Sequence, residues 1–473
     1  MSNISELLQQ NPGHFRILSV AGEIGEKENI PTFVVGGYIR DLLLSRKSKP
    51  DIDIMVEGDA LEYAKKLSKA LQLGKVIEYG QFNTALIPCG EVEVEVAGSR
   101  KEEYKSDSRK PIVSYATVEE DMARRDFTVN AMAASLWKSD FGRLYDPFNG
   151  IKDLNEKKLI TPLEPDKTFS DDPLRMMRAC RFAAQLEFEI DSKTLESIKS
   201  QASRIEIISK ERITEEIIKT LKADIPSIGF YKLKDVGLLK FVFPEIDIMP
   251  GVEVINGKGH KDVFIHTLQV VDNAAQLTES LNIRFAALVH DIAKPNTKRF
   301  YPDKGWTFHG HEEIGRRMLK KVAKRMKLSN ELRDYLMLMT KLHLRPIALA
   351  KRNITDSAVR RVMFEAGEFI DDLMTLCRAD ITSKNPKKVQ KYKGNFERVD
   401  ELMKDVKMRD EMKAFQSPIR GNEIMEIFEL KEGRVIGKIK SAIEEAILDG
   451  NIENTYDSAY KYMMDNKDNF FNN

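Results

Sequence analysis

The chain has 473 residues, of which 42% are apolar and 32% are charged, and its formal net charge is +1. This length exceeds what one hydrophobic core organises, so we expect about three domains. The near-zero net charge excludes a protein-wide field for nucleic acid, so any nucleic-acid surface must be a local patch.

Nothing in the sequence predicts export or membrane insertion. Residues 1–15 lack the charged start and apolar run of a signal peptide, and no uncharged apolar stretch approaches the roughly 20 residues that span a bilayer. The cysteines, Cys89, Cys180 and Cys377, lie far apart and form no CxxC pair. We therefore expect no membrane partner, no disulfide framework and a cytoplasmic location.

Helical patterns at residues 4–29 predict a lead-in that packs on the first domain. The apolar run Phe33–Val35 then predicts a short buried strand, and Tyr38–Leu44 predicts a helix. Gly36 and Gly37 lie between them. A glycine pair in this place exposes backbone N–H groups at the positive end of a helix, where a phosphate can bind.

The next predicted strand, residues 51–54 (DIDI), carries Asp51 and Asp53 on one face, because alternate residues of a strand point the same way. Two carboxylates beside a phosphate-binding turn suit divalent metal ions that carry a nucleoside triphosphate. Singly, a glycine pair is usually a turn and a DxD pair a solvated strand end. The order GG, Arg40-Asp41 and DxD is more specific, and it resembles the nucleotidyltransferase signature of the polymerase β superfamily.

One helical pattern and two strand patterns come after it, at Ala60–Leu71, Ala85–Pro88 and Val92–Val96. In the last strand Glu91, Glu93 and Glu95 alternate with valines, which is typical of an amphipathic strand with one solvated face. We keep that interpretation for Glu91 and Glu93. Glu95 looks like the third carboxylate that this superfamily places near its metals, with a solvated strand residue as the alternative.

A basic loop and a segment with two arginines come next. Residues 98–118 lose all periodicity, and a long loop within a compact domain is more often functional or mobile than idle. Residues 119–134 (EEDMARRDFTVNAMAA) predict a helix whose start presents Arg124 and Arg125. Surface arginine pairs are common, but arginine forks also suit triphosphate oxygens.

The segment Phe169–Phe182 predicts a helix that Ser170 caps, with Asp172 in its first turn. Asp172, Arg175 and Arg178 would then lie along one face. A capped helix with internal ion pairs explains these residues locally. Alternatively, Asp172 and Arg175 bind the Watson–Crick edge of a base, where Asp accepts from the amino group of cytosine or adenine and Arg donates to the ring.

Several motifs occur in the order seen in class II CCA-adding enzymes and bacterial poly(A) polymerases, namely GGYIRD, DID, RRDFTVNAMA, DPFNGIKDL, DDPLRMMRACRF and ISKERITEEIIK. This resemblance, over about residues 30–240, implies that Asp51 and Asp53 hold Mg²⁺. It implies that Asp172 and Arg175 select the base, with Arg178 close by. It also implies a set of residues that binds triphosphate or ribose: Gly36, Gly37, Arg40, Arg124 and Arg125.

The same resemblance assigns roles to two longer segments. Helical residues 178–240 carry scattered basic side chains, Arg181, Lys199, Arg204, Lys210, Arg212, Lys219 and Lys222. Such charges usually form a solvated face, but here they imply a neck that holds the tRNA acceptor end through salt-sensitive phosphate contacts. The segment 98–118 lies where these enzymes carry the flexible loop associated with the terminal A, which argues against CC addition alone.

Histidine becomes frequent after residue 259, and a single buried histidine is more often a satisfied core residue than a ligand. However, the order of His266, HDxxK, FHGHEE, LHLRP and Asp380 resembles an HD-type metal phosphohydrolase domain. Imidazoles with a carboxylate suit Mn, Ni, Co or Zn. The resemblance implies the core ligands His266, His290, Asp291 and Asp380, and the second-metal ligands His311 and His343. The domain could instead serve as an RNA-binding body.

The predicted fold is an α/β nucleotidyltransferase head with a polymerase β-like mixed sheet and helices, then an all-α neck, an HD-type helical body and a helical tail. The predicted parts are a lead-in (1–29), head (30–165), neck (166–245), HD domain (260–384) and tail (385–473). We expect the tail to contact the tRNA elbow or another subunit, which leaves a homodimer open.

The leading hypothesis is Mg²⁺-dependent addition of C, C and A to the tRNA 3′ end from CTP and ATP, with base choice made by the protein. The alternatives are a poly(A) polymerase, an A-adding enzyme, or HD-type phosphohydrolysis as the main activity. A purely RNA-binding protein is least favoured, because binding alone needs no paired carboxylates beside a phosphate turn.

Overall fold

The computed structural model describes residues 3–46, 51–103, 112–350, 354–383, 385–414, 417–448 and 451–471. The chain forms two compact units, the first from residues 1–344 and 371–384, the second from residues 345–370 and 385–473. The division into five predicted parts stays a prediction. The middle of the predicted loop, residues 104–111 with Lys105, Arg109 and Lys110, lies outside the described residues.

The first unit begins with a mixed sheet in the order β3-β4-β5-β2-β1-β8-β9. Only β2 and β5 pair in parallel, and the other neighbours are antiparallel. The strands are β1 (Thr32–Val35), β2 (Asp51–Val56), β3 (Ile77–Tyr79), β4 (Thr84–Cys89), β5 (Val92–Gly98), β8 (Ala133–Ser135) and β9 (Leu144–Tyr145). The mixed sheet predicted for the head is therefore confirmed.

Alternation along β2 decides which side chains enter the core. Ile52 and Ile54 are buried, whereas Asp51 is exposed and Asp53 is half-buried on the opposite face. Helices of the head are α1 (Ser5–Leu8), α2 (Pro12–Glu28), α3 (Gly37–Leu43) and α4 (Ala60–Ala70). The hydroxyl of Tyr63 in α4 donates to the carbonyl of Ala21 in α2, so the N-terminal helices pack on the head.

The helix predicted over residues 119–134 is wrong. A capping box of Thr117 and Glu120 starts α5 at Val118, and this helix ends at Ala123. Arg124 and Arg125 therefore come after the end of a helix instead of opening one. The 3₁₀ turn η2 (Thr128–Asn130) and β8 follow them in the chain. The small ladder of β6 (Arg100–Glu103) and β7 (Ile112–Tyr115) comes before α5.

The single helix predicted across Asp172 is also wrong. Helix α7 (Pro165–Asp171) ends at Asp171, Asp172 is extended, and α8 (Leu174–Leu186) starts after Pro173. The physical reason is steric, because a residue before proline is pushed out of the helical region. Ser170 lies inside α7 and caps nothing, but the carboxylate of Asp172 accepts from the backbone N–H of Leu174.

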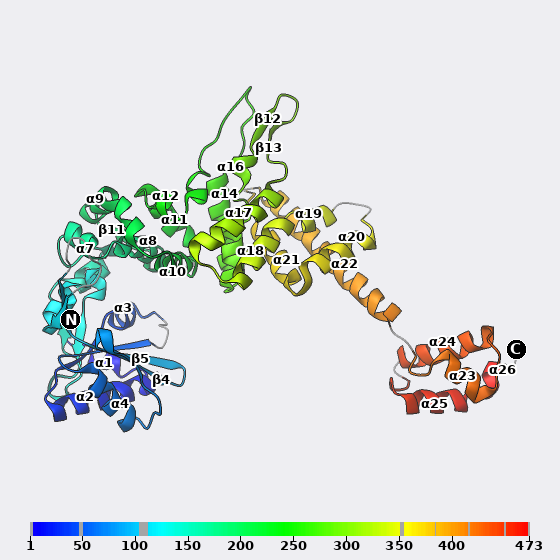
Figure 1. Cartoon of the computed structure of the whole chain (residues 1–473), viewed down its shortest axis with the longest axis horizontal. Coiled ribbons are helices and arrows are strands. Elements are labelled where there is room, and N and C mark those ends of the chain that lie inside the picture. The colour runs from blue at the N-terminus through cyan, green and yellow to red at the C-terminus, as the bar shows by residue number, and fades with distance from the viewer. Residues whose placement is uncertain are drawn as a thin grey trace. The chain divides into compact units, whose positions relative to one another are not determined.

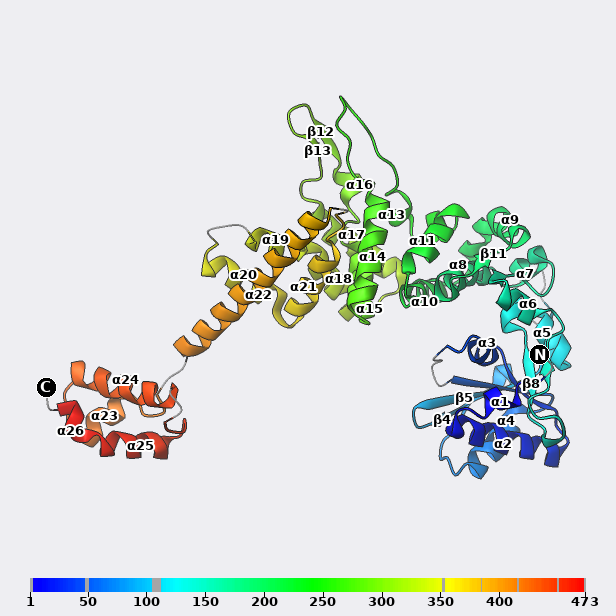
Figure 2. The ribbon, with the colours of Figure 1, turned by 180° about the vertical axis from the view of Figure 1, so that it is seen from behind.

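Helices make up most of the remainder of the first unit, together with the β12–β13 hairpin beyond α16, seen in both views (Figures 1 and 2). The elements are α6 (Gly150–Asn155), β10 (Lys158–Leu159), β11 (Glu189–Ile190), α9 (Ser192–Gln201), α10 (Lys210–Leu221), α11 (Pro226–Asp235), α12 (Leu239–Val242), α13 (Pro244–Asp247), α14 (Val263–Leu277), α15 (Leu281–Val289), α16 (Lys294–Thr297), β12 (Arg299–Tyr301), β13 (Gly305–Thr307), α17 (His311–Met326), α18 (Asn330–Leu342) and α21 (Ile370–Ala379). Buried Arg284 of α15 donates to the carbonyls of Leu221 and Ala223, and so ties the neck helices to those of the HD segment.

The second unit is helical; it joins residues 385–473, predicted as a helical tail, to residues 345–370, which were predicted as part of the HD domain. Its elements are α19 (Arg345–Leu349), α20 (Asp356–Ala366), α22 (Pro386–Ala414), α23 (Gly421–Phe428), α24 (Arg434–Leu448), α25 (Tyr456–Asp465) and α26 (Lys467–Phe471). A separate apolar cluster holds its last helices together: Ile419, Ile424, Ile436, Ile439, Ile443, Ala459 and Met463. No helix of either unit, within the described residues, is long and apolar enough to cross a membrane.

Candidate functional site

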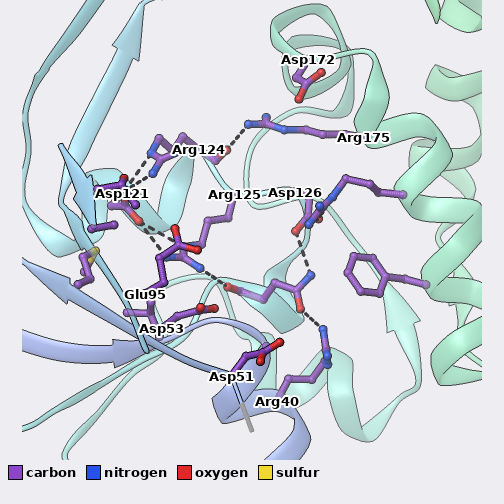
Figure 3. Close-up of a pocket in the computed structure, with 18 of the residues that line it drawn as sticks. Arg40, Asp51, Asp53, Glu95, Asp121, Arg124, Arg125, Asp126, Asp172 and Arg175 are labelled. Carbon is purple, nitrogen blue, oxygen red and sulfur yellow. Dashed lines mark hydrogen bonds and ion pairs between the residues drawn. The ribbon is translucent and has the colours of Figure 1, made fainter. Parts of the chain in front are cut away.

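Two neighbouring strands of the head, β2 and β5, supply three of the carboxylates that line one pocket. The parallel pairing of β2 with β5 sets Asp53 directly beside Glu95 and Asp51 beside Glu93. Asp51, Asp53 and Glu95 line the pocket, and in Figure 3 Asp53 and Glu95 lie near Arg125, whereas Asp51 lies toward Arg40. Burial and the neighbouring Asp51 raise the pKa of Asp53, and burial with Asp53 raises the pKa of Glu95. A cation between these groups would relieve both effects.

The glycine turn lies against this acidic face. Gly36 has a φ of 73°, in the region that favours glycine. A Cβ at this position would lie 2.7 Å from Nη1 of Arg125 and 3.6 Å from Oδ2 of Asp53. Gly36 is therefore required both for the turn and for the close approach of Arg125. Gly37 lines the pocket itself.

A buried carboxylate holds the two predicted phosphate-binding arginines. Oδ1 of Asp121 accepts from Nε (2.9 Å) and Nη2 (2.5 Å) of Arg124, and Oδ2 accepts from Nε and Nη2 of Arg125, both at 3.2 Å. Burial alone would raise the pKa of Asp121, but the two guanidinium groups lower it. Both arginines are therefore fixed in place, and Arg125 lies near Asp53 and Glu95.

A polar chain connects the glycine turn to helix α8. Nη1 of Arg40 donates to the side-chain oxygen of Asn130 (2.5 Å), whose Nδ2 donates to Asp126 (3.0 Å). Asp126 also accepts from Nε of Arg178 at 2.7 Å. Burial would raise the pKa of Asp126, but Arg178 and Asn130 lower it to about 2. Arg40 and Arg178 also lie against the ring of Phe182.

The predicted base-selecting residues both line the pocket, but through different elements. Oδ2 of Asp172 accepts from Arg212 of α10 at 2.9 Å. Arg175 donates through Nη2 to the carbonyl of Arg124 (2.5 Å) and through Nη1 to that of Thr168 (3.3 Å). The structure thus brings them to one pocket, with Arg175 above Arg124 in Figure 3.

Taken together, these groups surround a pocket of about 780 Å³, a volume within the usual range for small-molecule sites. Sequence reasoning missed Asp121, Asn130, Phe182 and the pairing of Arg212 with Asp172. Asp121 could have been found, because a residue three and four positions before two arginines lies within reach of both. Asn130 and Phe182 carried no local signal.

A second cluster forms in the HD segment from two groups of three side chains. Within each group, the possible ligand atoms lie within 4.8 Å of one another. One group is His266, His290 and Asp380, and the other is Asp291, His311 and His343. Asp291, predicted with the first group, lies between both: its Oδ2 is 3.2 Å from Nε2 of His290, and its Oδ1 is 3.3 Å from Nε2 of His311. His309 is exposed and belongs to neither group.

The hydrogen bonds of the cluster turn imidazole lone pairs toward one another. The Nδ1 atoms of His290, His311 and His343 each face a backbone carbonyl, at 2.7–2.8 Å. A carbonyl only accepts, so each Nδ1 carries a proton and each Nε2 is turned toward the cluster, where it can bind a cation through its lone pair. Backbone anchoring of this kind is typical of metal-ligating histidines.

The buried atoms left without hydrogen bonds also fit a cation. Among the described residues, Nε2 of His290 and Oδ1 of Asp291 are buried and make no hydrogen bond. Burial lowers the pKa of His343 to about 4, so its ring is neutral at pH 7. Burial would also lower the pKa of His266, but Asp291 and Asp380 raise it to about 9. The donor set therefore fits a transition metal.

Known families match three successive segments of the chain. Residues 32–160 match the poly A polymerase head domain, 187–249 the "probable RNA and SrmB-binding site of polymerase A", and 263–384 the HD domain. A multifunctional CCA protein of Psychromonas ingrahamii is 36% identical over 66% of this chain and 74% of the relative. A multifunctional CCA protein of Pseudoalteromonas atlantica is 34% identical over 74% of this chain and 84% of the relative. The chain belongs to the family of multifunctional CCA proteins.

Solved structures of similar fold carry related names. A CCA-adding enzyme in an apo form aligns with a TM-score of 0.61 and 23% identity over 98% of both chains. The Thermotoga maritima CCA-adding enzyme complexed with tRNA aligns with a TM-score of 0.58 and 22% identity, again over 98% of both chains. These likenesses confirm the predicted fold. The head and HD families are both metal-dependent.

Proposed function

We propose that this chain adds C, C and A to the 3′ end of tRNA from CTP and ATP. The observation that carries the proposal is one pocket that joins the carboxylates of β2 and β5, the arginines after α5 and the pair Asp172 and Arg175. The names of the relatives support the same reaction. The fold alone would fit many transferases.

In this proposal Asp51, Asp53 and Glu95 hold Mg²⁺, an ion that prefers carboxylate oxygens together with substrate phosphates. When bound, the ions would stabilise the charge that develops as the 3′-hydroxyl displaces pyrophosphate. Arg124 and Arg125 orient the triphosphate. Gly36 and Gly37 leave room for it, because no side chain there blocks the backbone.

Base choice rests on Asp172 and Arg175. An ionised carboxylate has about four acceptor positions, so Asp172 keeps capacity for the amino group of cytosine or adenine beside its bonds to Arg212 and Leu174. A guanidinium has five donors, and the two carbonyl contacts of Arg175 leave others for the ring. At the position of that amino group uracil and guanine carry a carbonyl oxygen, which cannot donate to Asp172.

Part of the basic neck is available for RNA. Lys199, Arg212 and Lys222 are exposed, and we propose that they contact tRNA phosphates. Arg181 is excluded from this role, because it is buried against Glu216 at 2.6 Å. The three cysteines are unpaired, which suits the reducing cytoplasm that we propose as the location.

The HD cluster supports a second activity, metal-dependent phosphoester hydrolysis. The specific observation is the pair of orphaned buried atoms, Nε2 of His290 and Oδ1 of Asp291, within a ready ligand set. A transition metal bound there would polarise a phosphoryl oxygen. Poly(A) synthesis and A-only addition remain alternatives for the head.

The test uses tRNAs that end before CCA, after C and after CC, each incubated with labelled CTP or ATP and Mg²⁺, with products resolved to single nucleotides. We expect C, C and A in turn. Asp53→Asn should lower the rate about 10³-fold or more, because metal-borne charge stabilisation is worth several kcal/mol, while tRNA still binds.

Glu95→Gln should also lose activity, whereas Glu93→Gln is its matched control, on the same strand and face but outside the pocket lining. Long A tracts would favour a poly(A) polymerase, and A added only after CC would favour an A-adding enzyme. Full turnover in both Asp53→Asn and Glu95→Gln would refute the metal assignment.

A further inference from the structure

Asp121 is a charged residue in the nucleotide pocket with no evident contact to make with a substrate. Its side chain is 2% exposed, and it lies in the first turn of α5. The capping box of Thr117 and Glu120 fixes the start of this short helix. The backbone N–H of Arg100 also donates to Oδ1 of Asp121, at 3.4 Å. The carboxylate is therefore positioned by a capped helix and contacted by one backbone N–H.

The contacts of Asp121 are divided evenly between two arginines. Each carboxylate oxygen receives the Nε–Nη2 edge of one guanidinium, Oδ1 from Arg124 and Oδ2 from Arg125. Fork-shaped contacts of this kind fix the plane of a guanidinium as well as its place. Nη1 of Arg125 then reaches the carbonyl of Asn130, at 3.4 Å, on the side of the glycine turn.

A negative charge in this place opposes triphosphate binding. Asp121 cancels one of the two positive charges that would attract the phosphates. If affinity for the nucleotide were the only requirement, a neutral residue would serve better. The benefit of the carboxylate must therefore be orientation, which acts on the rate of the reaction more than on ground-state binding.

Asp121 also protects the acidic face from the arginines. Arg125 lies near Asp53, as its 2.7 Å approach to a Cβ on Gly36 indicates. Nevertheless, within the described residues Arg125 pairs with Asp121 and with neither Asp53 nor Glu95. A guanidinium released from Asp121 could bind Asp53, and would then compete with the cation that Asp53 is proposed to hold.

We propose that Asp121 is a positioning residue for nucleotidyl transfer, which aims Arg124 and Arg125 at the leaving pyrophosphate and keeps Arg125 off Asp53 and Glu95. This inference rests on the proposed function of the pocket. Asp121 touches neither the substrate nor the metal ions, and it acts through the two arginines alone.

The test measures kcat and KM for ATP on a tRNA that ends in CC. Circular dichroism gives the folded fraction, so that kcat is expressed per folded molecule. Asp121→Asn should lower kcat about 10–100-fold, because small misplacements of an orienting group have effects of this size. Its KM should stay within about threefold, because both arginines and a higher positive charge remain. A purely structural residue would lower the folded fraction and leave the kcat of folded molecules unchanged.

A double-mutant cycle tests whether the effect passes through Arg125. In an Arg125→Ala background, Asp121→Asn should cost much less in kcat than it does alone, since contacting residues are not additive. Glu119→Gln, an exposed first-turn change in the same helix, is the matched control and should behave as wild type.

If Asp121→Asn does not fold, Asp121→Glu takes its place, since it keeps the charge but moves the carboxylate by one methylene. It should lower kcat at least about fivefold with KM retained. A folded Asp121 variant with the wild-type kcat, or fully additive effects in the cycle, would overturn the inference alone. A wild-type chain that incorporates no nucleotide would overturn the proposed function, and this inference with it.

Discussion

The pocket of the head and the histidine cluster of the HD segment both gather carboxylates, but only one of them is a finished ligand set. In the HD cluster, two groups of three residues already hold their ligand atoms within 4.8 Å. The described part of the head contains no such group. Its carboxylates lie on neighbouring strands and face arginines.

This difference indicates two kinds of metal use. Mg²⁺ is commonly held by one or two carboxylates and completed by substrate phosphates, which suits the open acidic face of Asp51, Asp53 and Glu95. Imidazoles anchored through Nδ1 suit a resident transition metal. We therefore propose that a nucleotide completes the head site, whereas the candidate ligand atoms of the HD site already lie together without a substrate.

The largest effect that we expect is on metal binding by the HD cluster, after loss of one histidine ligand. His290→Ala should weaken binding of Mn²⁺ or Zn²⁺ by more than about 100-fold, since loss of an outer partner alone costs 10–100-fold. Metal content after dialysis, measured by mass spectrometry, checks the prediction. Nucleotide incorporation with Mg²⁺ should remain unchanged, because the head does not use this site.

His309→Ala is the control for that experiment, since His309 is exposed and outside both groups. It should retain the full metal content. Metal retained by His290→Ala would contradict the assignment of the cluster, and a parallel loss of nucleotide incorporation would contradict the independence of the two sites.

The two regions also differ in what their sequence reveals. Alternation along β2 predicted that Asp51 and Asp53 share a face, because a strand carries its own geometry. The pocket as a whole depends on contacts over distance: Asp172 meets Arg212 forty positions later. No local pattern encodes such a contact. Asp172 and Arg175 were brought together by a helix face that the structure does not form and by the resemblance to a family.

Local signals were also misread at two helix boundaries. Pro173 excludes Asp172 from a helix, yet the charges around it suggested one continuous face. The capping box at Thr117 and Glu120 marks the true start of α5, and it was overlooked in favour of the arginines. The HD histidines were foreseen in order, but not that Asp291 lies between both groups.

An effect of intermediate size tests whether Arg175 of the head pocket selects the base of the incoming nucleotide. Arg175→Ala should reduce discrimination against UTP and GTP about 10–100-fold, because a specific base contact is worth about 1–3 kcal/mol. Competition between labelled nucleotides gives the ratio directly. Lys199→Ala, an exposed basic change in the neck, should leave the ratio unchanged. Unaltered discrimination in Arg175→Ala would refute its role.

The smallest effect concerns Asp126, which holds the base side of the head pocket through Arg178. Its pKa of about 2 lies below its ordinary value of 3.8. A depressed carboxyl pKa stabilises the folded state above the ordinary pKa, and this contribution is lost as the pH falls toward 2. This difference in pKa corresponds to about 2 kcal/mol in the free energy of unfolding.

Asp126→Asn should therefore lower the thermal midpoint most at pH 5–7, and its gap from wild type should narrow between about pH 4 and pH 2. Asp334→Asn is the control, because Asp334 is an exposed carboxylate paired with Arg333 and solvent screens such pairs. The thermal midpoint of Asp334→Asn should differ little from that of wild type at any pH. A gap for Asp126→Asn that stays constant from pH 7 to pH 3 would mean that the ionised carboxylate does not stabilise the head. The arginine network would then owe its order to packing against Phe182, whereas backbone carbonyls anchor the histidines of the HD cluster.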